Sequence, residues 1–252
     1  MYDIHSHALP GIDDGPMDWD TAVNMVRQAV KDGIKGITLT PHIKPGYFEP
    51  KKEQISQLAD DLKSLVQTEP VELYLGSEIT LFPETVLGIL SGLYLTINSG
   101  RYVLIELPES FSPSNVQDLI FTLTSKEMIP VIAHPERNPR VRSDLNLFSD
   151  LVRMGAVGQI DAGSITGYFG ADVRKTASEM LSRRLVHIMA TDAHSDTIRA
   201  PLLSAGVKEV GRLWGRRLAS QMVNDLPMRI IRNELFYLPE PEQPKKFCIF
   251  KR

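Results

Sequence analysis

Short apolar runs alternate along the chain with stretches in which apolar residues recur every three or four positions. The runs are rich in valine and isoleucine and lack the polar alternation of a strand with one solvated face. Each run is therefore predicted to be a strand that is buried on both faces. The predicted strands are Tyr2–His5, Gly36–Thr40, Glu72–Ile79, Tyr102–Leu107, Ile129–His134, Val157–Asp161 and Val186–Thr191.

The stretches between the runs have the spacing of amphipathic helices, in which positions i, i+3, i+4 and i+7 share one face. Ser112-Pro113 is typical of a helix N-cap followed by proline at the first helical position. The apolar faces predicted between the strands are Val23, Val26 and Val30; Val116, Leu119, Ile120 and Leu123; and Leu147, Leu151 and Met154. Two later helices are predicted at Ile198–Leu213 and Arg216–Asp225.

Seven such strand–helix units predict an α/β fold with a parallel, barrel-like sheet. No tandem repeat interrupts residues 1–238, which we interpret as one domain. The remaining segment, Pro239–Arg252, contains three prolines and a basic, aromatic ending. We expect it to be a flexible extension outside the core.

Every predicted strand has a histidine or a carboxylate at or beside its carboxyl end, and in a parallel barrel these ends meet on one face. Alternate residues of a strand point the same way, so the two imidazoles of His5-Ser6-His7 could reach one ion. A carboxylate such as Glu78 could bridge two ions. The residues at the strand ends, and in the loop after the first strand, are His5 and His7, Asp13 and Asp14, His42, Glu78, Glu106, His134, Asp161, Asp192 and His194.

Composition and charge exclude several classes of function. The chain is 42% apolar with a net charge of −3, which argues against a nucleic-acid-binding surface. No apolar run is long enough for a transmembrane segment, and the N-terminus lacks the features of a signal peptide, so we expect a cytoplasmic protein. The one cysteine, Cys248, excludes a cysteine-cluster zinc site and lies in the polar tail, where we expect no cysteine-based catalysis.

Five of the six histidines lie at predicted strand ends. A single histidine at such a place is usually a cap or a solvated residue, and His187, within a strand, is interpreted as structural. The joint pattern instead predicts two or three divalent metal ions, with manganese favoured and iron or zinc as alternatives. A pair of such ions can activate water for attack on phosphorus.

Two arginines follow the predicted ligands closely, Arg137 after His134 and Arg199 after His194. Each could be an ordinary surface charge. Their shared placement beside the predicted ligands favours binding of phosphate oxygens, which a planar guanidinium matches in geometry.

These motifs resemble the PHP (polymerase and histidinol phosphatase) superfamily, and within it the CpsB/CapC-like bacterial tyrosine phosphatases of capsule and exopolysaccharide loci. The similarity runs from residue 1 to about 235, and the opening His5-Ser6-His7-Ala8-Leu9-Pro10-Gly11-Ile12-Asp13-Asp14-Gly15 is specific to this branch. Asp161 departs from the pattern, because a threonine-like residue is more usual there. The resemblance implies a distorted (β/α)7 barrel of the PHP type.

The resemblance also implies three metal sites and an activity. His5, His7, Glu78 and Asp192 would hold the first ion, Glu78, Glu106 and His134 the second, and Asp14, His42 and His194 the third. Arg137, Arg199 and His42 would be the catalytic residues. The implied reaction is hydrolysis of phosphotyrosine in proteins by a metal-activated hydroxide, and the implied partner is a phosphorylated tyrosine autokinase of capsule or exopolysaccharide synthesis.

Three alternatives stay open at this point. A small-molecule phosphoesterase, such as a histidinol-phosphate phosphatase, could use the same ions. A nuclease or proofreading module is disfavoured by the acidic balance, and a scaffold with structural metals by the number of ligands. The tail could contact an anionic membrane surface through Phe247, Ile249 and Phe250 with their basic neighbours, although a solvated tail is the simpler alternative. Whether the chain forms a homo-oligomer is not determined.

Overall fold

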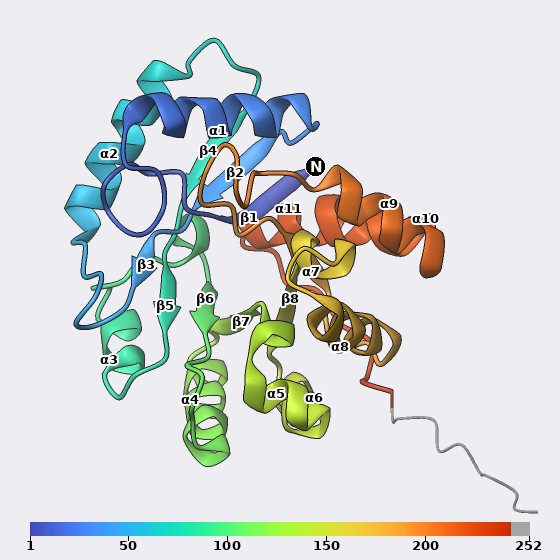
Figure 1. Cartoon of the computed structure of the whole chain (residues 1–252). Helices are drawn as coiled ribbons and strands as arrows, with labels where there is room; N and C mark the ends of the chain where they lie inside the picture. The colour runs from blue at the N-terminus through green and yellow to red at the C-terminus, as the bar shows by residue number, and fades with distance from the viewer. Residues whose placement is uncertain (243–252) are drawn as a thin grey trace, which may run out of the picture.

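The computed structural model describes residues 1–242, in which short parallel strands lie at the centre and helices surround them (Figure 1). One sheet has the order β1-β2-β4 and the other has the order β3-β5-β6-β7-β8-β9. The strands are β1 (Tyr2–Ser6), β2 (Gly36–Leu39), β3 (His42–Ile43), β4 (Glu72–Leu75), β5 (Glu78–Thr80), β6 (Tyr102–Glu106), β7 (Ile129–Ala133), β8 (Val157–Asp161) and β9 (Ile188–Ala190).

One predicted strand is interrupted, because Glu72–Ile79 is divided into β4 and β5. The predicted strand Gly36–Thr40 forms as β2 and ends one residue earlier, at Leu39. The short strand β3, which was not predicted, follows after Pro41, which lacks a backbone N–H. Hydrogen bonds from Gly76 N to Leu39 O (2.9 Å) and from Glu78 N to Pro41 O (3.1 Å) continue the pairing where the two sheets meet.

The first and last strands also touch. Ser6 and Ala193 form a parallel bridge beside β1 and β9, and His7 N donates to Ala193 O at 2.8 Å. The N-terminal and C-terminal strands therefore bring their polar ends together across nearly the whole length of the chain.

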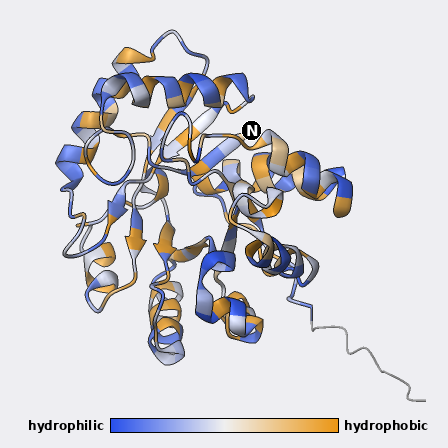
Figure 2. Ribbon diagram, viewed as in Figure 1, coloured by the Kyte–Doolittle hydropathy of each residue, from blue (hydrophilic) through white to orange (hydrophobic). Residues whose placement is uncertain are grey.

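Helices cover the outer faces of the strands, and Figure 2 shows that their apolar residues alternate with polar ones. The predicted apolar faces fall in α1, α4 and α6, whereas α2, α3, α5, α7, α8 and α11 have no counterpart among the predicted helices. The helices are α1 (Trp19–Lys31), α2 (Lys52–Leu65), α3 (Thr85–Leu90), α4 (Pro113–Ser125), α5 (Pro139–Ser143), α6 (Leu145–Arg153), α7 (Ala162–Thr166), α8 (Ala171–Ser182), α9 (Ser204–Leu213), α10 (Arg216–Ser220) and α11 (Leu226–Ile231).

One of the two later helix predictions needs correction, and the other is confirmed. The helix predicted at Ile198–Leu213 begins only at Ser204, because Arg199 has a left-handed backbone (φ 56°) and Pro201 follows it. The helix predicted at Arg216–Asp225 does form, as α10 and then a π-helical turn over Gln221–Asp225. Ser112 does occupy the N-cap of α4 with Pro113 after it, but its hydroxyl lies 2.8 Å from that of Ser114 and does not cap the helix.

His187 is buried just before β9, and its Nδ1 accepts a hydrogen bond from Gly158 N at 3.1 Å. Burial lowers the pKa of this imidazole to about 4. The unfolded chain, with a histidine pKa of about 6.5, therefore binds more protons between these two values. This histidine makes the folded state lose stability as the pH falls from about 6.5 to 4.

His187→Asn should remove this pH dependence, because an asparagine oxygen can accept the same hydrogen bond but does not titrate. The free energy of unfolding of the native protein should fall by up to about 3 kcal/mol more than that of the variant between pH 7 and pH 4. Urea denaturation of both proteins at several pH values measures the difference. Parallel pH profiles would contradict the prediction.

The described part of the predicted tail contacts the body of the protein. Glu242 N donates to Arg183 O at 2.9 Å, and its carboxylate lies 2.7 Å from the Arg184 guanidinium. The cysteine at position 248 and the aromatic and basic residues predicted to reach a membrane lie outside the described residues. Within residues 1–242, no helix is both long enough and apolar enough to cross a bilayer.

Candidate metal centre

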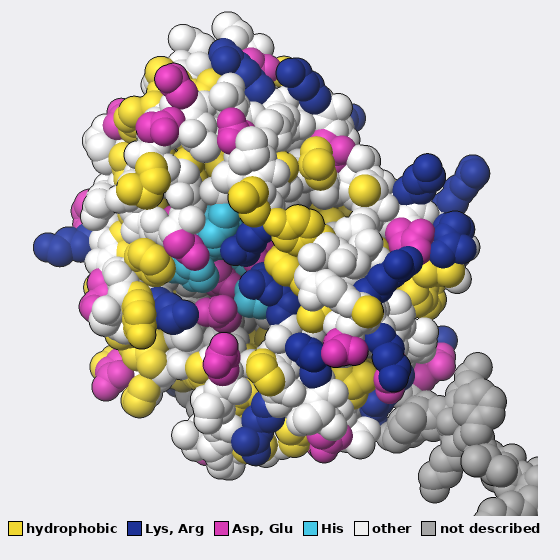
Figure 3. All heavy atoms as spheres, viewed as in Figure 1, with side chains coloured by type: hydrophobic (Ala, Val, Ile, Leu, Met, Phe, Trp, Pro, Cys, Tyr) yellow, Lys and Arg dark blue, Asp and Glu magenta, His cyan; other side chains and the backbone are white. Residues whose placement is uncertain are grey.

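The histidines and carboxylates predicted from the strand ends gather on one face of the molecule. In Figure 3, atoms of the buried histidines are visible in a hollow of this face, with acidic and basic side chains around them. His5 and Glu106 lie at or near the carboxyl ends of β1 and β6, whereas His42 and Glu78 are the first residues of the short strands β3 and β5. The remaining members follow strands in loops: His7 and Asp14 after β1, His134 after β7, and Asp192 and His194 after β9.

The first group consists of His5, His7, Glu78 and Asp192, all buried and each offering a ligand atom within 4.8 Å of the others. The Nε2 atoms of His5 and His7 lie 3.1 Å apart, and each lies 3.2 Å from Glu78 Oε2 and 3.4 Å from Asp192 Oδ1. These are the four residues that the resemblance implies for the first ion. Two nitrogens and two carboxylate oxygens suit a divalent cation such as Mn²⁺, Fe²⁺ or Zn²⁺.

The second group brings together His42, Glu78 and Glu106, so Glu78 belongs to two groups. The sequence analysis placed His134 here and His42 elsewhere. In the structure His134 Nε2 lies 2.9 Å from Glu78 Oε1, whereas His42 Nδ1 lies 3.0 Å from Glu78 Oε2. His134 therefore touches the shared carboxylate without joining the group that contains Glu106.

The third group contains Asp14, His42 and His194, as the resemblance implies, and also His7. Asp14 Oδ1 lies 3.4 Å from His42 Nε2 and 3.3 Å from His194 Nε2. The Asp14 side chain is half exposed, unlike the other members. This group therefore forms the solvent side of the centre.

Four candidate ligand atoms of these groups are buried and lack hydrogen-bond partners. Within residues 1–242, they are His42 Nδ1, Glu78 Oε2, Asp192 Oδ1 and His194 Nε2. Leaving a buried polar atom unpaired costs about 1–3 kcal/mol, so four of them need an explanation. Each belongs to a residue of the three groups, whose ligand atoms lie within 4.8 Å of one another, which fits bound cations.

Hydrogen bonds hold the imidazoles with Nε2 facing the centre. His5 Nδ1 donates to Gln159 Oε1 at 2.9 Å, and His7 Nδ1 donates to Asp13 Oδ2 at 2.7 Å. With Nδ1 used as a donor, the neutral ring keeps its lone pair on Nε2, where a cation can bind. His194 Nδ1 donates in the same way to Asp192 O at 3.0 Å.

Gln159 was not among the residues predicted for the site, and Asp13 was named there without a specific role. Gln159 lies two positions before Asp161 on β8, so the period of two along a strand was the signal that could have identified it. Asp13 also accepts from His42 N at 3.0 Å and from Gly15 N at 2.9 Å. Gly15 packs so closely that a Cβ would lie 2.3 Å from His7 O, which explains the Asp13-Asp14-Gly15 sequence.

Arg137 and Arg199 both donate to Asp192 Oδ2, Arg137 NH1 at 2.5 Å. Arg137 NH1 also donates to Asp161 Oδ2 at 3.0 Å, and its guanidinium lies 4.5 Å from the Phe169 ring centre. Asp161 is buried and accepts this hydrogen bond, which holds the Arg137 guanidinium in place. Arg199 Nε is buried and has no partner in the described part of the chain, which leaves a donor free for an anion.

Neighbouring side chains hold two carboxylates of the centre in their ionised form. Burial opposes ionisation of Glu78 and Asp192, but the surrounding imidazoles, and Arg199 beside Asp192, outweigh it and hold the pKa of both well below the usual range. Glu136, buried beside the centre, behaves differently: burial and then the charge of Asp161 raise its pKa to about 7.

The backbone is strained at three residues of this centre. His134, Asp192 and Arg199 have φ values of 31°, 50° and 56°, in the left-handed region that non-glycine residues rarely occupy. Such conformations cost about 1–3 kcal/mol each and gather at functional sites, where the surrounding fold maintains them.

Comparisons with known proteins agree with this geometry. Residues 1–232 match the family described as capsular polysaccharide synthesis, CpsB/CapC. The chain is 31% identical over 252 residues to the tyrosine-protein phosphatase YwqE of Bacillus subtilis, covering 99% of each chain. It is 26% identical over 242 residues to the tyrosine-protein phosphatase CpsB of Streptococcus pneumoniae, covering 93% of this chain and 100% of the relative.

A solved structure, from a crystallographic study of YwqE and CpsB as metal-dependent tyrosine phosphatases, superposes on this chain with a TM-score of 0.93. It is 31% identical in sequence, and the match covers 98% of this chain and 100% of the other. The fold, the polar centre and the matched sequence therefore all indicate the same family. This chain belongs to the CpsB/CapC family.

Proposed function

We propose that this protein is a metal-dependent phosphatase that hydrolyses phosphotyrosine in proteins. The observation that carries the proposal is the set of buried, unpaired ligand atoms converging beside two arginines. The similarity to YwqE and CpsB, which are named tyrosine-protein phosphatases, supports the same reaction.

The proposed ligand sets are the three groups of the centre, with Glu78 shared by two of them. His134, whose Nε2 lies 2.9 Å from Glu78 Oε1, is proposed as a further ligand beside Glu78. Bound divalent ions would supply positive charge and lower the pKa of a bound water. We favour manganese, with iron and zinc as alternatives, because the ligands are all nitrogen and oxygen.

Arg137 and Arg199 are proposed to bind the phosphoryl oxygens. In the structure NH1 of Arg137 is directed to Asp161 and Asp192, which holds the guanidinium plane beside the ligand cluster. Fixed positive charge placed before the reaction stabilises the charge that develops on the oxygens in the transition state. No cysteine occurs among residues 1–242, so the described part of the chain offers no thiol nucleophile.

We further propose that the strands form a distorted (β/α)7 barrel within a single domain spanning residues 1–238. The seven strands of the barrel would be β1, β2 continued by β3, β4 continued by β5, β6, β7, β8 and β9. The hydrogen bonds across the interruptions and the bridge between Ser6 and Ala193 support this closure. The proposed substrate is a phosphorylated tyrosine autokinase, in keeping with the capsular role in the family's description.

Chelation tests the proposed function directly. The purified protein should hydrolyse a phosphotyrosine peptide, lose at least about 100-fold in rate when stripped of metal, and recover on addition of Mn²⁺. Elemental analysis before and after chelation gives the metal and its amount. Full activity of the stripped protein would refute the metal mechanism. Faster hydrolysis of histidinol phosphate than of the peptide would favour a small-molecule phosphoesterase.

A further inference from the structure

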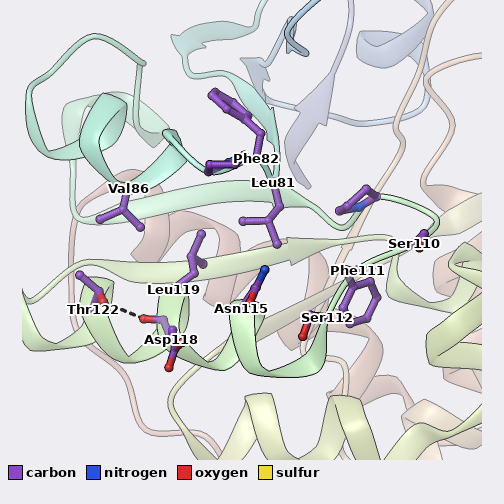
Figure 4. Close-up of a pocket in the computed structure, with 12 residues that line it drawn as sticks. Leu81, Phe82, Val86, Ser110, Phe111, Ser112, Asn115, Asp118, Leu119 and Thr122 are labelled. Atoms are coloured by element: carbon purple, nitrogen blue, oxygen red, sulfur yellow. Dashed lines mark hydrogen bonds between the residues drawn. The ribbon is translucent and has the colours of Figure 1, made fainter.

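A groove beside the metal centre has no role in the chemistry described so far. It has a volume of about 510 Å³ and lies between the segment that leads from β5 into α3 and the segment that leads from β6 into α4 (Figure 4). We call it the α3–α4 groove. Its walls include the apolar side chains of Leu81, Phe82, Val86, Phe111 and Leu119.

Hydrogen bonds to Glu106 connect one wall of the α3–α4 groove to the metal centre. Leu81 N donates to Glu106 O at 2.9 Å, and the Thr80 hydroxyl donates to Glu106 Oε2 at 2.8 Å. On the other wall, Asn138 Nδ2 donates to Pro108 O at 2.9 Å, and Asn138 directly follows Arg137. One end of the groove is therefore tied to a proposed metal ligand and to a proposed phosphate-binding arginine.

The lining of the groove fits a polypeptide better than an anion. Among residues 1–242, no lysine or arginine lines it, and Asp118 contributes a carboxylate. A site for a second phosphate would need cationic or backbone donors, as the metal centre has. Apolar walls with a few hydrogen-bonding groups, here including the Asn115 amide, are typical of sites that bind an apolar side chain and orient the chain beside it.

We propose that the α3–α4 groove binds the polypeptide segment next to the phosphotyrosine, with an apolar side chain of that segment against Phe82, Val86 and Leu119. This inference rests on the proposed function and specifies its substrate class: a phosphotyrosine flanked by apolar, non-acidic residues. The metal centre acts on the phosphoryl group, and the groove distinguishes a protein tail from a free phosphomonoester.

Variants in the groove test the proposal. Val86→Lys places a charge on an apolar wall, and Asn115→Trp fills the groove from an exposed helical position without adding charge. Leu87→Lys is the matched control, because Leu87 is 69% exposed on the same helix and does not line the groove. The substrates are p-nitrophenyl phosphate, a phosphotyrosine peptide with apolar flanking residues, and the same peptide with glycine flanks.

Both groove variants should raise KM for the apolar peptide about tenfold, since they remove the burial of one side chain. Their kcat/KM for p-nitrophenyl phosphate should equal that of the native protein, and Leu87→Lys should change neither. The glycine-flanked peptide should have a high KM with the native protein and the variants alike. Equal activity toward p-nitrophenyl phosphate also shows that a variant is folded.

Other outcomes overturn the inference in distinguishable ways. An unchanged KM for the apolar peptide in Asn115→Trp would show that the groove does not bind this segment. Equal losses on the peptide and on p-nitrophenyl phosphate would place the effect in the phosphoryl site. A change of oligomeric state in light scattering, with KM unaltered, would assign the groove to a second copy of the chain. A native protein that hydrolyses no phosphotyrosine peptide would refute the proposed function itself.

Discussion

Substituting Asp192 by alanine should lower kcat/KM for phosphotyrosine hydrolysis by at least about 10³-fold, equivalent to about 4 kcal/mol of transition-state stabilisation. The Asp192 carboxylate contacts both the proposed metal ligands and the two arginines. Its Oδ1 lies 3.4 Å from both His5 Nε2 and His7 Nε2, and its Oδ2 accepts from Arg137 and Arg199. Steady-state kinetics measure the loss of activity, and elemental analysis measures the metal content of the variant.

Asp196→Ala is the control for this variant. Asp196 lies in the same loop after β9, but its side chain accepts only from the exposed Asn24 amide (3.3 Å) among the described residues. It should retain native metal content and native activity. An Asp192→Ala protein that is fully metallated and active would exclude this carboxylate from the centre.

Substituting Arg137 by alanine should lower kcat/KM by about 10²–10³-fold, the usual loss when one preorganised donor to a developing negative charge is removed. Its metal content should stay native, because Arg137 contacts the carboxylates of the centre and offers no ligand atom. Arg199 still pairs with Asp192 in the variant. The inhibition constant of inorganic phosphate should rise with the loss of activity.

Lysine at position 137 should restore only part of the activity, since an ammonium ion replaces the charge but not the planar fork of donors. Arg142→Ala is the matched control, because Arg142 pairs with the exposed Asp172 at 3.8 Å, away from the centre. If Arg137→Ala loses metal in proportion to activity, its role is to support the ligands and not to bind phosphate.

The positions of many strands can be predicted from the local sequence, because a strand that is buried on both faces is a mostly apolar run. The strand Val157–Asp161 was predicted with the observed bounds. Where short-range pattern failed, a backbone constraint was responsible. Gly76-Ser77 divides the predicted strand Glu72–Ile79 into β4 and β5, and Arg199 and Pro201 prevent the first part of the helix predicted at Ile198–Leu213.

The site divides in the same way. The sequence alone determined that histidines and carboxylates stand at or just after the ends of the predicted strands. Only the tertiary structure decided which of these proposed ligands lie together. His42 lies in one group with Glu78 and Glu106, because this depends on how neighbouring strands are aligned and where their loops turn. Gln159 reaches His5 across 154 positions of the chain, a contact that no local pattern contains.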